Sequence, residues 1–360
     1  MWPSTRICEL FGIEHPIVQA PMAGSDTPEL AAAVTNAGGL GSMGLTGHSP
    51  DDIRKKTTAA RATTNGALNY NFLVYRIPAA DPVRWARAVE ALAPLYSDRG
   101  IMSAPDAPGE WLEVNPDRVR AAIAGSPRVM SFHFGLPEPN LVDEIKAAGI
   151  KVMCSATSAD EARRLEDTGC DAIIAQGWEA GGHRGIHSDP DSLAAGAGEI
   201  GTLALVPTVV DAVSVPVIAA GGISDPRGIA AAFMLGADGV QMGTAFLQCP
   251  ESGICAAHRR ALAGAKAEDT RVTRGFSGRP ARAIRNRLTE ALADRDDAIA
   301  PFPFQYDVIG PLRETSDAQD DGDFIPLWAG QGVGLTVAVP AAEFVQRTAD
   351  AALRLLGRSG

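Results

Sequence analysis

The sequence predicts an α/β protein built on a (β/α)8 barrel, followed by a C-terminal helical lid or small second domain. Eight short apolar segments alternate with helical segments between residues 17 and 250, which is the arithmetic of an eightfold barrel. These segments are apolar without alternation, as in strands buried on both faces. A doubly wound open sheet is the alternative, but no nucleotide-binding fingerprint supports it. We expect a barrel over 1–250 and a helical segment packed on it over 251–360.

Turn and capping signals divide the barrel into its elements. Proline at first-turn positions, such as Pro82 and Pro226, and glycines such as Gly149 and Gly169 mark helix starts and ends. Thr27 or Asp26 is placed to cap the first long helix. The strands are expected to begin near residues 17, 39, 67, 129, 150, 171, 216 and 239. The intervening helices are expected at 28–37, 50–62, 81–93, 115–124, 138–148, 158–168, 201–213 and 225–235.

Two parts of the chain do not follow this alternation. Residues 97–110 are rich in proline and glycine and predict an irregular insertion. After residue 250 the pattern predicts helices at 251–265, 280–297 and 340–356, with an exposed polar loop at 313–323. Apolar residues in this charged region suggest an edge that closes over the barrel; the set is Phe302, Phe304 and Trp328, with Gln331 beside them.

Charge and composition exclude several partners. The net charge of -11 and the isoelectric point near 5.1 argue against nucleic acid or an acidic membrane surface. No apolar run is long enough to span a bilayer, and the first residues lack the apolar core of a signal peptide. The five cysteines are scattered and form no C-x-x-C, which favours free thiols in a reducing cytoplasm over a disulfide or zinc framework.

Residues 39–44 match G-x-G-x-x-G, the spacing of a dinucleotide-binding loop. That fingerprint needs a strand before it and a helix that opens within it. Here a helix precedes the motif, and the motif itself contains the second strand. We therefore reject the dinucleotide interpretation.

The ends of the last two barrel strands predict a phosphate site. Gly221 and Gly222 end the seventh strand, and Gly243 and Thr244 end the eighth. Loops at these positions present backbone N–H groups to an anion in many barrels. Tight turns alone would also explain the glycines. Other strand-end candidates are Met22, Ala23, Gly24, Asn69, His133, Gln176, Gly181, His183 and Gln241.

Amides and histidines suggest what the site binds. Asn69 and Gln176 can donate and accept hydrogen bonds without charge, which suits a neutral ring such as flavin. His133 and His183 both follow strands, and His183 lies in the glycine-rich loop 175–185. The alternative for this loop is a mobile surface turn with a solvated histidine. His187 completes H-x3-H with His183, but the glycine between them and the absence of a carboxylate cluster argue against a metal.

Taken together, these segments resemble the class I nitronate monooxygenases, formerly called 2-nitropropane dioxygenases. The His133 and His183 segments are the specific ones, because other FMN barrels share the first segment and the double glycine. The resemblance covers nearly the whole chain. Its segments are 19–24, 131–137, 175–185, 216–223, 301–305 and 328–331.

The resemblance implies an FMN-dependent TIM barrel that uses O2 to convert alkyl nitronates to a carbonyl compound and nitrite. It makes His183 the catalytic histidine and His133 a substrate-side residue. A histidine with a near-neutral pKa could also take the α-proton of a neutral nitroalkane; whether nitroalkanes are substrates stays open, as do the nitro compound and the oligomeric state. The implied FMN residues are Met22, Ala23, Gly24, Asn69, Gln176, Gly181, Gly222, Gln241, Gly243 and Thr244, with Gly221 and Met242 beside them.

Three other functions remain open at this point. The first is an NAD(P)H-dependent enoyl-acyl-carrier-protein reductase, an FMN barrel with a similar loop, in which added nicotinamide would bleach the flavin. The second is a non-catalytic flavin-binding protein, which would need neither strand-end histidine. The third is a purine-metabolism isomerase or dehydrogenase, but no cysteine follows a strand where its nucleophile belongs.

Overall fold

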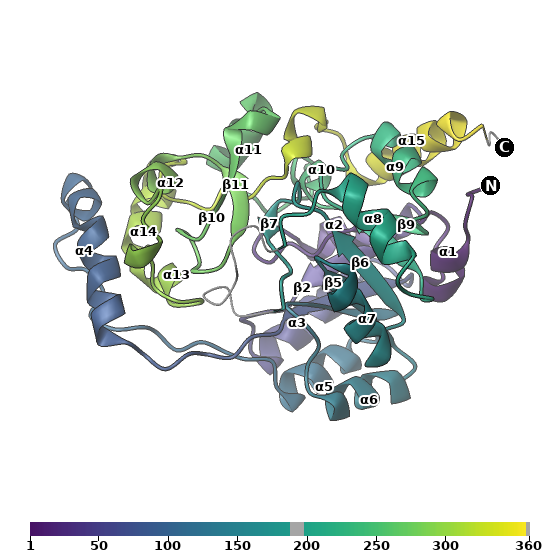
Figure 1. Cartoon of the computed structure of the whole chain (residues 1–360), viewed down its shortest axis with the longest axis horizontal. Helices are drawn as coiled ribbons and strands as arrows, with labels where there is room; N and C mark the ends of the chain where they lie inside the picture. Colours follow the sequence, from purple (N-terminus) through teal and green to yellow (C-terminus); the bar gives the residue numbers. More distant parts are fainter. Residues whose placement is uncertain (188–197, 358–360) are drawn as a thin grey trace.

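The computed structural model describes residues 1–187 and 198–357. Eight parallel strands form the barrel in the order β1-β9-β8-β6-β5-β4-β3-β2, and a bridge from Val18 to Leu40 joins the two ends of the sheet (Figure 1). The predicted (β/α)8 fold is confirmed, and each expected strand is present. The strands are β1 (Ile17–Gln19), β2 (Gly41–Gly44), β3 (Leu68–Leu73), β4 (Val129–His133), β5 (Lys151–Ala156), β6 (Ala172–Gln176), β8 (Val217–Ala220) and β9 (Gly239–Met242).

Helices pack around this sheet, and side chains cap several of them. The Thr27 hydroxyl accepts from Leu30 N, and the Asp225 carboxylate accepts from the N–H groups of Arg227 and Gly228. Short α1 (Arg6–Phe11) packs Ile7 and Phe11 against the strands of the barrel. The outer helices are α2 (Pro28–Asn36), α3 (Pro50–Arg61), α5 (Pro116–Ala124), α6 (Pro139–Ala147), α7 (Ala159–Asp167), α8 (Thr202–Val210) and α9 (Pro226–Met234).

The last barrel helix comes from the end of the chain. Helix α10 (Thr244–Leu247) follows β9 but has only four residues. Helix α15 (Ala341–Leu355) instead packs between α9 and α2, and its Phe344, Val345 and Ala349 join the barrel core. Figure 1 shows α15 beside α9 and close to the N-terminus. The C-terminal segment therefore contains both a lid and a piece of the barrel wall.

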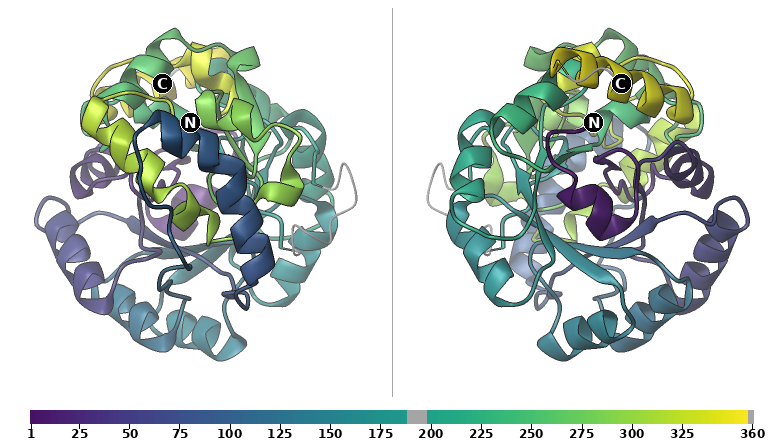
Figure 2. Two further views of the ribbon diagram at one scale, coloured as in Figure 1. Left: turned by 90° about the vertical axis from the view of Figure 1, so that its left-hand side faces the viewer. Right: turned by 90° about the vertical axis from the view of Figure 1, so that its right-hand side faces the viewer.

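The part of the C-terminal segment that covers the barrel has its own hydrophobic core, and this core includes a helix from the first half of the sequence. Helix α4 (Pro82–Asp98) was expected to cover the barrel, but its Trp85, Leu92 and Tyr96 pack with Phe276 and Phe304 instead. Figure 2 shows α4 lying across the face of the molecule together with helices of the C-terminal segment. We call α4 and residues 251–339 the cap. The insertion after α4, residues 99–115, contains no helix or strand.

The cap also contains a small sheet that the sequence did not predict. Strand β11 (Ala281–Ile284) pairs on one side with β10 (Thr270–Thr273) and on the other with β7 (Gly182–His183). The expected helix at 280–297 is therefore wrong over its first part. The expected loop at 313–323 is largely helical, because α14 (Gly310–Gln319) covers most of it. The remaining cap elements are α11 (Ala256–Gly264), η2 (Ala267–Asp269), α12 (Arg287–Ala291), η3 (Asp296–Ala298), α13 (Gln305–Val308), α14 (Gly310–Gln319) and η4 (Gln331–Leu335).

The glycines at 39–44 serve packing within the barrel. Gly41 begins β2, and a Cβ there would lie 1.9 Å from the carbonyl oxygen of Ala31 in α2. The glycine lets the helix and strand approach closely, as expected when the motif itself holds a strand. Within 1–187 and 198–357, no helix combines the length and apolarity that crossing a bilayer requires.

Candidate active site

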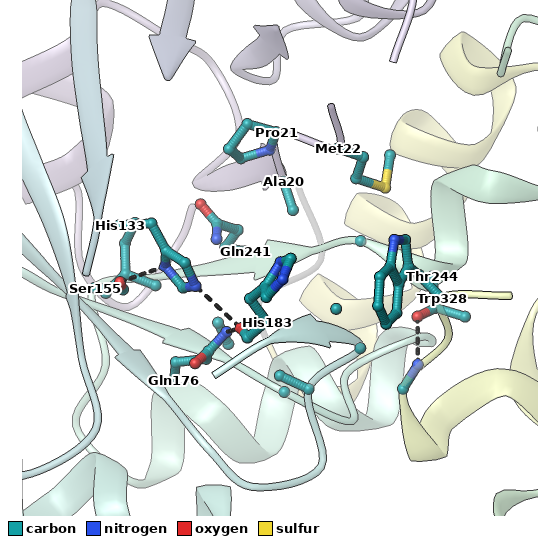
Figure 3. A pocket seen from close by; sticks show the side chains of 18 of the residues that line it. Ala20, Pro21, Met22, His133, Ser155, Gln176, His183, Gln241, Thr244 and Trp328 are labelled. Carbon is teal, nitrogen blue, oxygen red and sulfur yellow. Dashed lines mark hydrogen bonds between the residues drawn. The ribbon is translucent and has the colours of Figure 1, made fainter. Parts of the chain in front are cut away.

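One cavity lies at the carboxyl ends of the barrel strands, under the cap, where barrels place their ligand sites (Figure 3). Three predicted site residues do not line it: Gly24, Asn69 and Met242. The predicted residues that do line it are Met22, Ala23, His133, Gln176, Gly181, His183, Gly221, Gly222, Gln241, Gly243 and Thr244.

The residues outside the cavity have identifiable positions. Asn69 lies deeper in the barrel, where its Nδ2 donates to the Ser42 hydroxyl at 3.0 Å. Asn71, two residues on and on the same face of β3, lines the cavity instead and donates to Ser131. Met242 packs in the hydrophobic core shared by the strands and the surrounding helices. Gly24 lies in an exposed turn with φ +84°.

The loop that carries His183 is pinned to the barrel and to the cap. His183 pairs with Ala281 of β11, so the loop adds a strand to the cap sheet. Gln176 donates to the His183 carbonyl at 2.9 Å and accepts from Gly185 N at 2.7 Å. The buried Arg184 donates to the carbonyls of Gln176 and Gly177. The interpretation as a mobile turn with a solvated histidine is therefore wrong.

His133 has both ring nitrogens engaged. Its Nε2 lies 3.0 Å from the His183 carbonyl, which can only accept, so Nε2 carries the proton. Its Nδ1 accepts from the Ser155 hydroxyl at 2.5 Å. Burial lowers the pKa of His133 to about 4, and nearby cations such as Arg279 add to the shift. His133 is a neutral support for the His183 backbone, and neither nitrogen is free for a ligand.

One nitrogen of the His183 imidazole is hydrogen-bonded, and the other has no partner among the described residues. Its Nε2 lies 2.9 Å from the Ser277 hydroxyl in the cap. Its Nδ1 has no hydrogen-bond partner in the described parts of the chain, and it is not among the side-chain atoms sealed from solvent there. Burial, with smaller contributions from His133 and Arg279, lowers the pKa of His183 to about 3. The pKa of His183 therefore lies below the near-neutral value considered from the sequence, and the ring is neutral at physiological pH.

Three aromatic rings surround this imidazole. The Trp328, Phe134 and Phe302 ring centroids lie 5.5, 5.7 and 5.7 Å from that of His183. Phe134 adopts φ +72°, a backbone conformation that is rare for a bulky residue and recurs at functional sites. The Arg279 guanidinium stacks 4.0 Å from the centre of its ring. The rings give the site an apolar wall that excludes water from one side of His183.

The cavity also offers unused hydrogen-bonding groups. Gln241 Oε1 is buried and has no partner among the described residues, which is costly unless a ligand supplies a donor. The N–H groups of Gly222, Gly243 and Thr244 likewise have no acceptor in the described chain. Gly221 and Gly222 have φ of +113° and +71°, so their turn requires glycine. These groups fit a ligand that has a polar ring and a phosphate.

Residues 328–332, which we call the strap, close the cavity on this side. Gly330 N donates to Thr244 Oγ1 at 2.9 Å, as drawn in Figure 3, and Gln331 N donates to the Glu179 carbonyl. His258 Nε2 donates to the Trp328 carbonyl at 3.1 Å. The strap approaches so closely that a Cβ on Gly330 would lie 2.7 Å from the Glu179 carbonyl oxygen.

The described residues hold no group of three or more histidine, cysteine or acidic side chains suited to a metal ion. His187 does not complete a site with His183. Its Nε2 donates to the Ser155 carbonyl at 2.8 Å.

With this geometry in place, comparison with known proteins identifies the family. The family model described as nitronate monooxygenase matches residues 4–349. The chain belongs to the nitronate monooxygenase family. It is an enzyme, an oxidoreductase.

Similar proteins and solved structures cover nearly the whole chain. The nitronate monooxygenase of Pseudomonas aeruginosa is 42% identical over 344 residues, which cover 95% of this chain and 97% of the relative. The structure of nitroalkane oxidase from Streptomyces ansochromogenes is 35% identical with a TM-score of 0.86, covering 98% of this chain and 99% of that one. FabK from Thermotoga maritima is 31% identical with a TM-score of 0.75, covering 99% and 98%.

Several residues at this nitronate monooxygenase-family site were not found from the sequence. Ser277 and Tyr306 come from the cap, and Ser131 and Ser155 come from inside strands. Their residue types are common, and no spacing ties them to His183. Trp328 and Phe302 were expected to face inward and do contact His183, whereas Phe304, from the same expected edge, packs into the cap core.

Proposed function

We propose that this protein oxidises alkyl nitronates with O2, using FMN bound in the cavity, to give a carbonyl compound and nitrite. The observation that carries the proposal is the shared cavity: the His183 imidazole, fixed by Ser277, lines the same space as the unused hydrogen-bonding groups that suit FMN. The relatives' names point to nitronates and nitroalkanes as the substrate class. The same cavity supplies the unused groups that a flavin phosphate and ring need.

The residues proposed to hold FMN divide into two groups. The N–H groups of Gly222, Gly243 and Thr244 would bind the phosphate. Gln241 Oε1 would accept from a ring N–H, and Met22 and the neighbouring Ala23 would line the same wall. When bound, FMN supplies the electron acceptor for the nitronate and the route to O2. Gln176, Gly181 and Gly221 would shape the site, while Asn69, Gly24 and Met242 would support it from outside the cavity.

The chain's own residues would seat the substrate and move its proton. The rings of Phe134, Phe302 and Trp328 enclose the imidazole and would exclude water around the nitro group. With a neutral nitroalkane, His183 would take the α-proton, leaving the electron pair of the C–H bond on the nitronate. His133 would act as a support, because both of its nitrogens are bonded.

Oxygen uptake tests this proposal. The purified protein is loaded with FMN, its absorption spectrum is recorded, and oxygen uptake is measured with ethyl- and propyl-nitronate. Uptake with nitrite release is expected, without NADH or NADPH. Flavin bleaching by NADH under anaerobic conditions would favour the reductase alternative. Bound flavin with neither reaction would leave a non-catalytic flavoprotein, and failure to bind FMN would reject the proposal.

A further inference from the structure

The hydroxyl of Ser277 is the one polar contact of the His183 ring in the described structure. Ser277 is fully buried in the turn between β10 and β11, 94 positions from His183 in the sequence. A hydroxyl has one proton to donate and two lone pairs that accept. The direction of its bond to the histidine therefore decides which ring nitrogen carries the proton.

The other bonds of Ser277 set that direction. Its hydroxyl donates to the Arg279 carbonyl at 3.2 Å and accepts from Arg279 N at 3.2 Å. One lone pair then remains, and it faces His183 Nε2 at 2.9 Å. Only a proton on Nε2 satisfies all three contacts. If the hydroxyl donated to Nε2 instead, the Arg279 carbonyl would lose its bond to Ser277.

We propose that Ser277 is a positioning residue that holds His183 as the Nε2–H tautomer, so that the lone pair of Nδ1 faces the cavity. Nδ1 is then a proton acceptor and cannot donate to a ligand while the ring is neutral. In a neutral nitroalkane, the Cα–H bond breaks, its electron pair stays on the nitronate, and the proton goes to Nδ1. This proton transfer leaves an imidazolium beside the nitronate anion.

The same tautomer has a different consequence when the substrate is already a nitronate. The anion would meet the Nδ1 lone pair, so it binds well only after the ring takes up a proton from solvent. Because the pKa of the free His183 ring lies well below neutral, this proton uptake becomes harder as pH rises. The kcat/KM for nitronates should therefore fall about tenfold per pH unit across the range above the pKa of His183, which includes pH 5 to 8. The kcat/KM for nitroalkanes needs no such proton and should not fall.

Nitrogen NMR tests the tautomer without reference to turnover. The protein is labelled with nitrogen-15 histidine, and the His183 signals are assigned as those lost in His183→Asn. Wild-type protein should show a pyrrole-type Nε2 and a pyridine-type Nδ1. Ser277→Ala should shift the ring toward the other tautomer, and Ser277→Thr, which keeps the hydroxyl, should restore the wild-type pattern. A protonated Nδ1 in the neutral wild-type ring would overturn the proposal.

A kinetic test of Ser277 rests on the proposed function, whereas the NMR spectrum does not. A failure of the tautomer proposal can therefore be distinguished from a failure of the proposed function. Ser277→Ala should lower nitroalkane kcat/KM on the order of tenfold, the typical loss with one hydrogen bond. It should also flatten the pH dependence with nitronates, because the freed ring can present Nδ1–H. Ser316→Ala, which removes a buried cap hydroxyl that accepts from Phe324 N, is the matched control and should change neither. Unchanged pH profiles in Ser277→Ala would contradict the positioning role.

Discussion

At the scale of single residues, His183 and Gln241 supply two unused acceptor atoms to one cavity. His183 has a committed Nε2 and an open Nδ1, and its low pKa keeps the ring neutral. Gln241 presents a buried carbonyl oxygen that has no donor among the described residues. The first residue is ready to accept a proton, and the second is ready to accept a hydrogen bond from a ligand.

His183→Asn should separate the two substrate forms. Asparagine keeps a polar group near Ser277 but removes the base, and loss of a general base costs on the order of 10²–10⁴ in rate. We expect that loss with neutral nitroethane and a much smaller one with ethylnitronate, with FMN still bound. Initial rates with freshly diluted nitroethane and with preformed nitronate measure both.

The pH profile of the wild-type enzyme adds to this test. A base works only above its pKa, and the pKa of His183 is lowered to about 3. Nitroalkane turnover should therefore show no rise from His183 between pH 5 and 8. A tenfold rise per unit across that range would mean that the ring titrates near neutrality in the working enzyme. Equal losses in His183→Asn for both substrates would mean that His183 is not specifically a base.

Gln241→Met should weaken FMN binding without destabilising the apoprotein. Methionine has a similar length but no carbonyl, so FMN loses a hydrogen bond, which weakens binding on the order of tenfold. The apoprotein loses a buried unpaired oxygen, so its melting temperature should stay equal or rise. Fluorescence titration with FMN and thermal unfolding of the apoprotein measure the two effects. A fall in both would show that Gln241 is structural.

At the scale of elements, the site depends on contacts between the barrel loops and the cap. The strap meets the loop after β6 backbone to backbone, and Phe302 and Trp328 reach His183 from the cap. Asp26 supports the loop after β1, since its carboxylate accepts from Met22 N at 2.8 Å and Gly44 N at 2.7 Å. The sequence left two candidates for the N-cap of α2. Thr27 caps the helix, whereas Asp26 supports the loop after β1.

Gly330→Ala should displace the strap. Its φ of -84° suits alanine, so the effect comes only from the added Cβ, which would lie 2.7 Å from the Glu179 oxygen. Overpacking of this kind costs about 1–3 kcal/mol, and we expect faster FMN release. Gly334→Ala is the control in the same segment, because its Cβ would meet nothing closer than 3.7 Å. Equal FMN dissociation rates in the two variants would mean that the strap does not retain the cofactor.

Phe302→Ala should widen the substrate range. Phe302 and Phe134 contact the His183 ring and line a second cavity, so removing the Phe302 ring should open that cavity toward His183. We expect KM for long-chain nitronates such as hexylnitronate to fall relative to ethylnitronate. Phe324→Ala, in the cap core, removes the same volume elsewhere and should leave the ratio of the two KM values unchanged. An unchanged ratio in Phe302→Ala as well would place the alkyl chain elsewhere.

At the scale of the whole molecule, the cap is a long excursion between β9 and the last barrel helix. The chain leaves the barrel after α10, builds most of the cap, and returns as α15 to close the ring of helices. The proposed division at residue 250 thus separates segments that share cores, since α4 joins the cap and α15 joins the barrel. Removing the C-terminal part of the cap by truncation would also remove α15, so such a variant would test the integrity of the barrel more than closure of the site.

Phe344→Ala should show that α15 stabilises the barrel. Phe344 is buried, and its ring lies 5.0 Å from that of Phe246 in the barrel core. Removing a buried phenylalanine typically costs about 3–5 kcal/mol. Urea unfolding should show this loss, with the kcat of the folded enzyme unchanged. Leu355→Ala, at an exposed site on the same helix, is the control, and equal unfolding midpoints for the two variants would contradict the assignment.

The sequence by itself determined the eight barrel strands, the polar residues at their carboxyl ends and the loop of His183. These features depend on local signals, namely buried apolar runs, helix caps and glycines that end elements, which survive without knowledge of the partner segments. The same local reasoning rejected the G-x-G-x-x-G motif at 39–44, where Gly41 packs a strand against a helix.

Only the tertiary structure decided what surrounds these residues. Ser277 reaches His183 across 94 positions, and Asn71 lines the cavity while Asn69 lies deeper in the barrel. Helix α4 joins the cap and α15 the barrel because each buries its apolar face where a matching surface lies, and helix periodicity does not say which surface that is. The low pKa of His183 has the same origin, since burial by distant segments sets it.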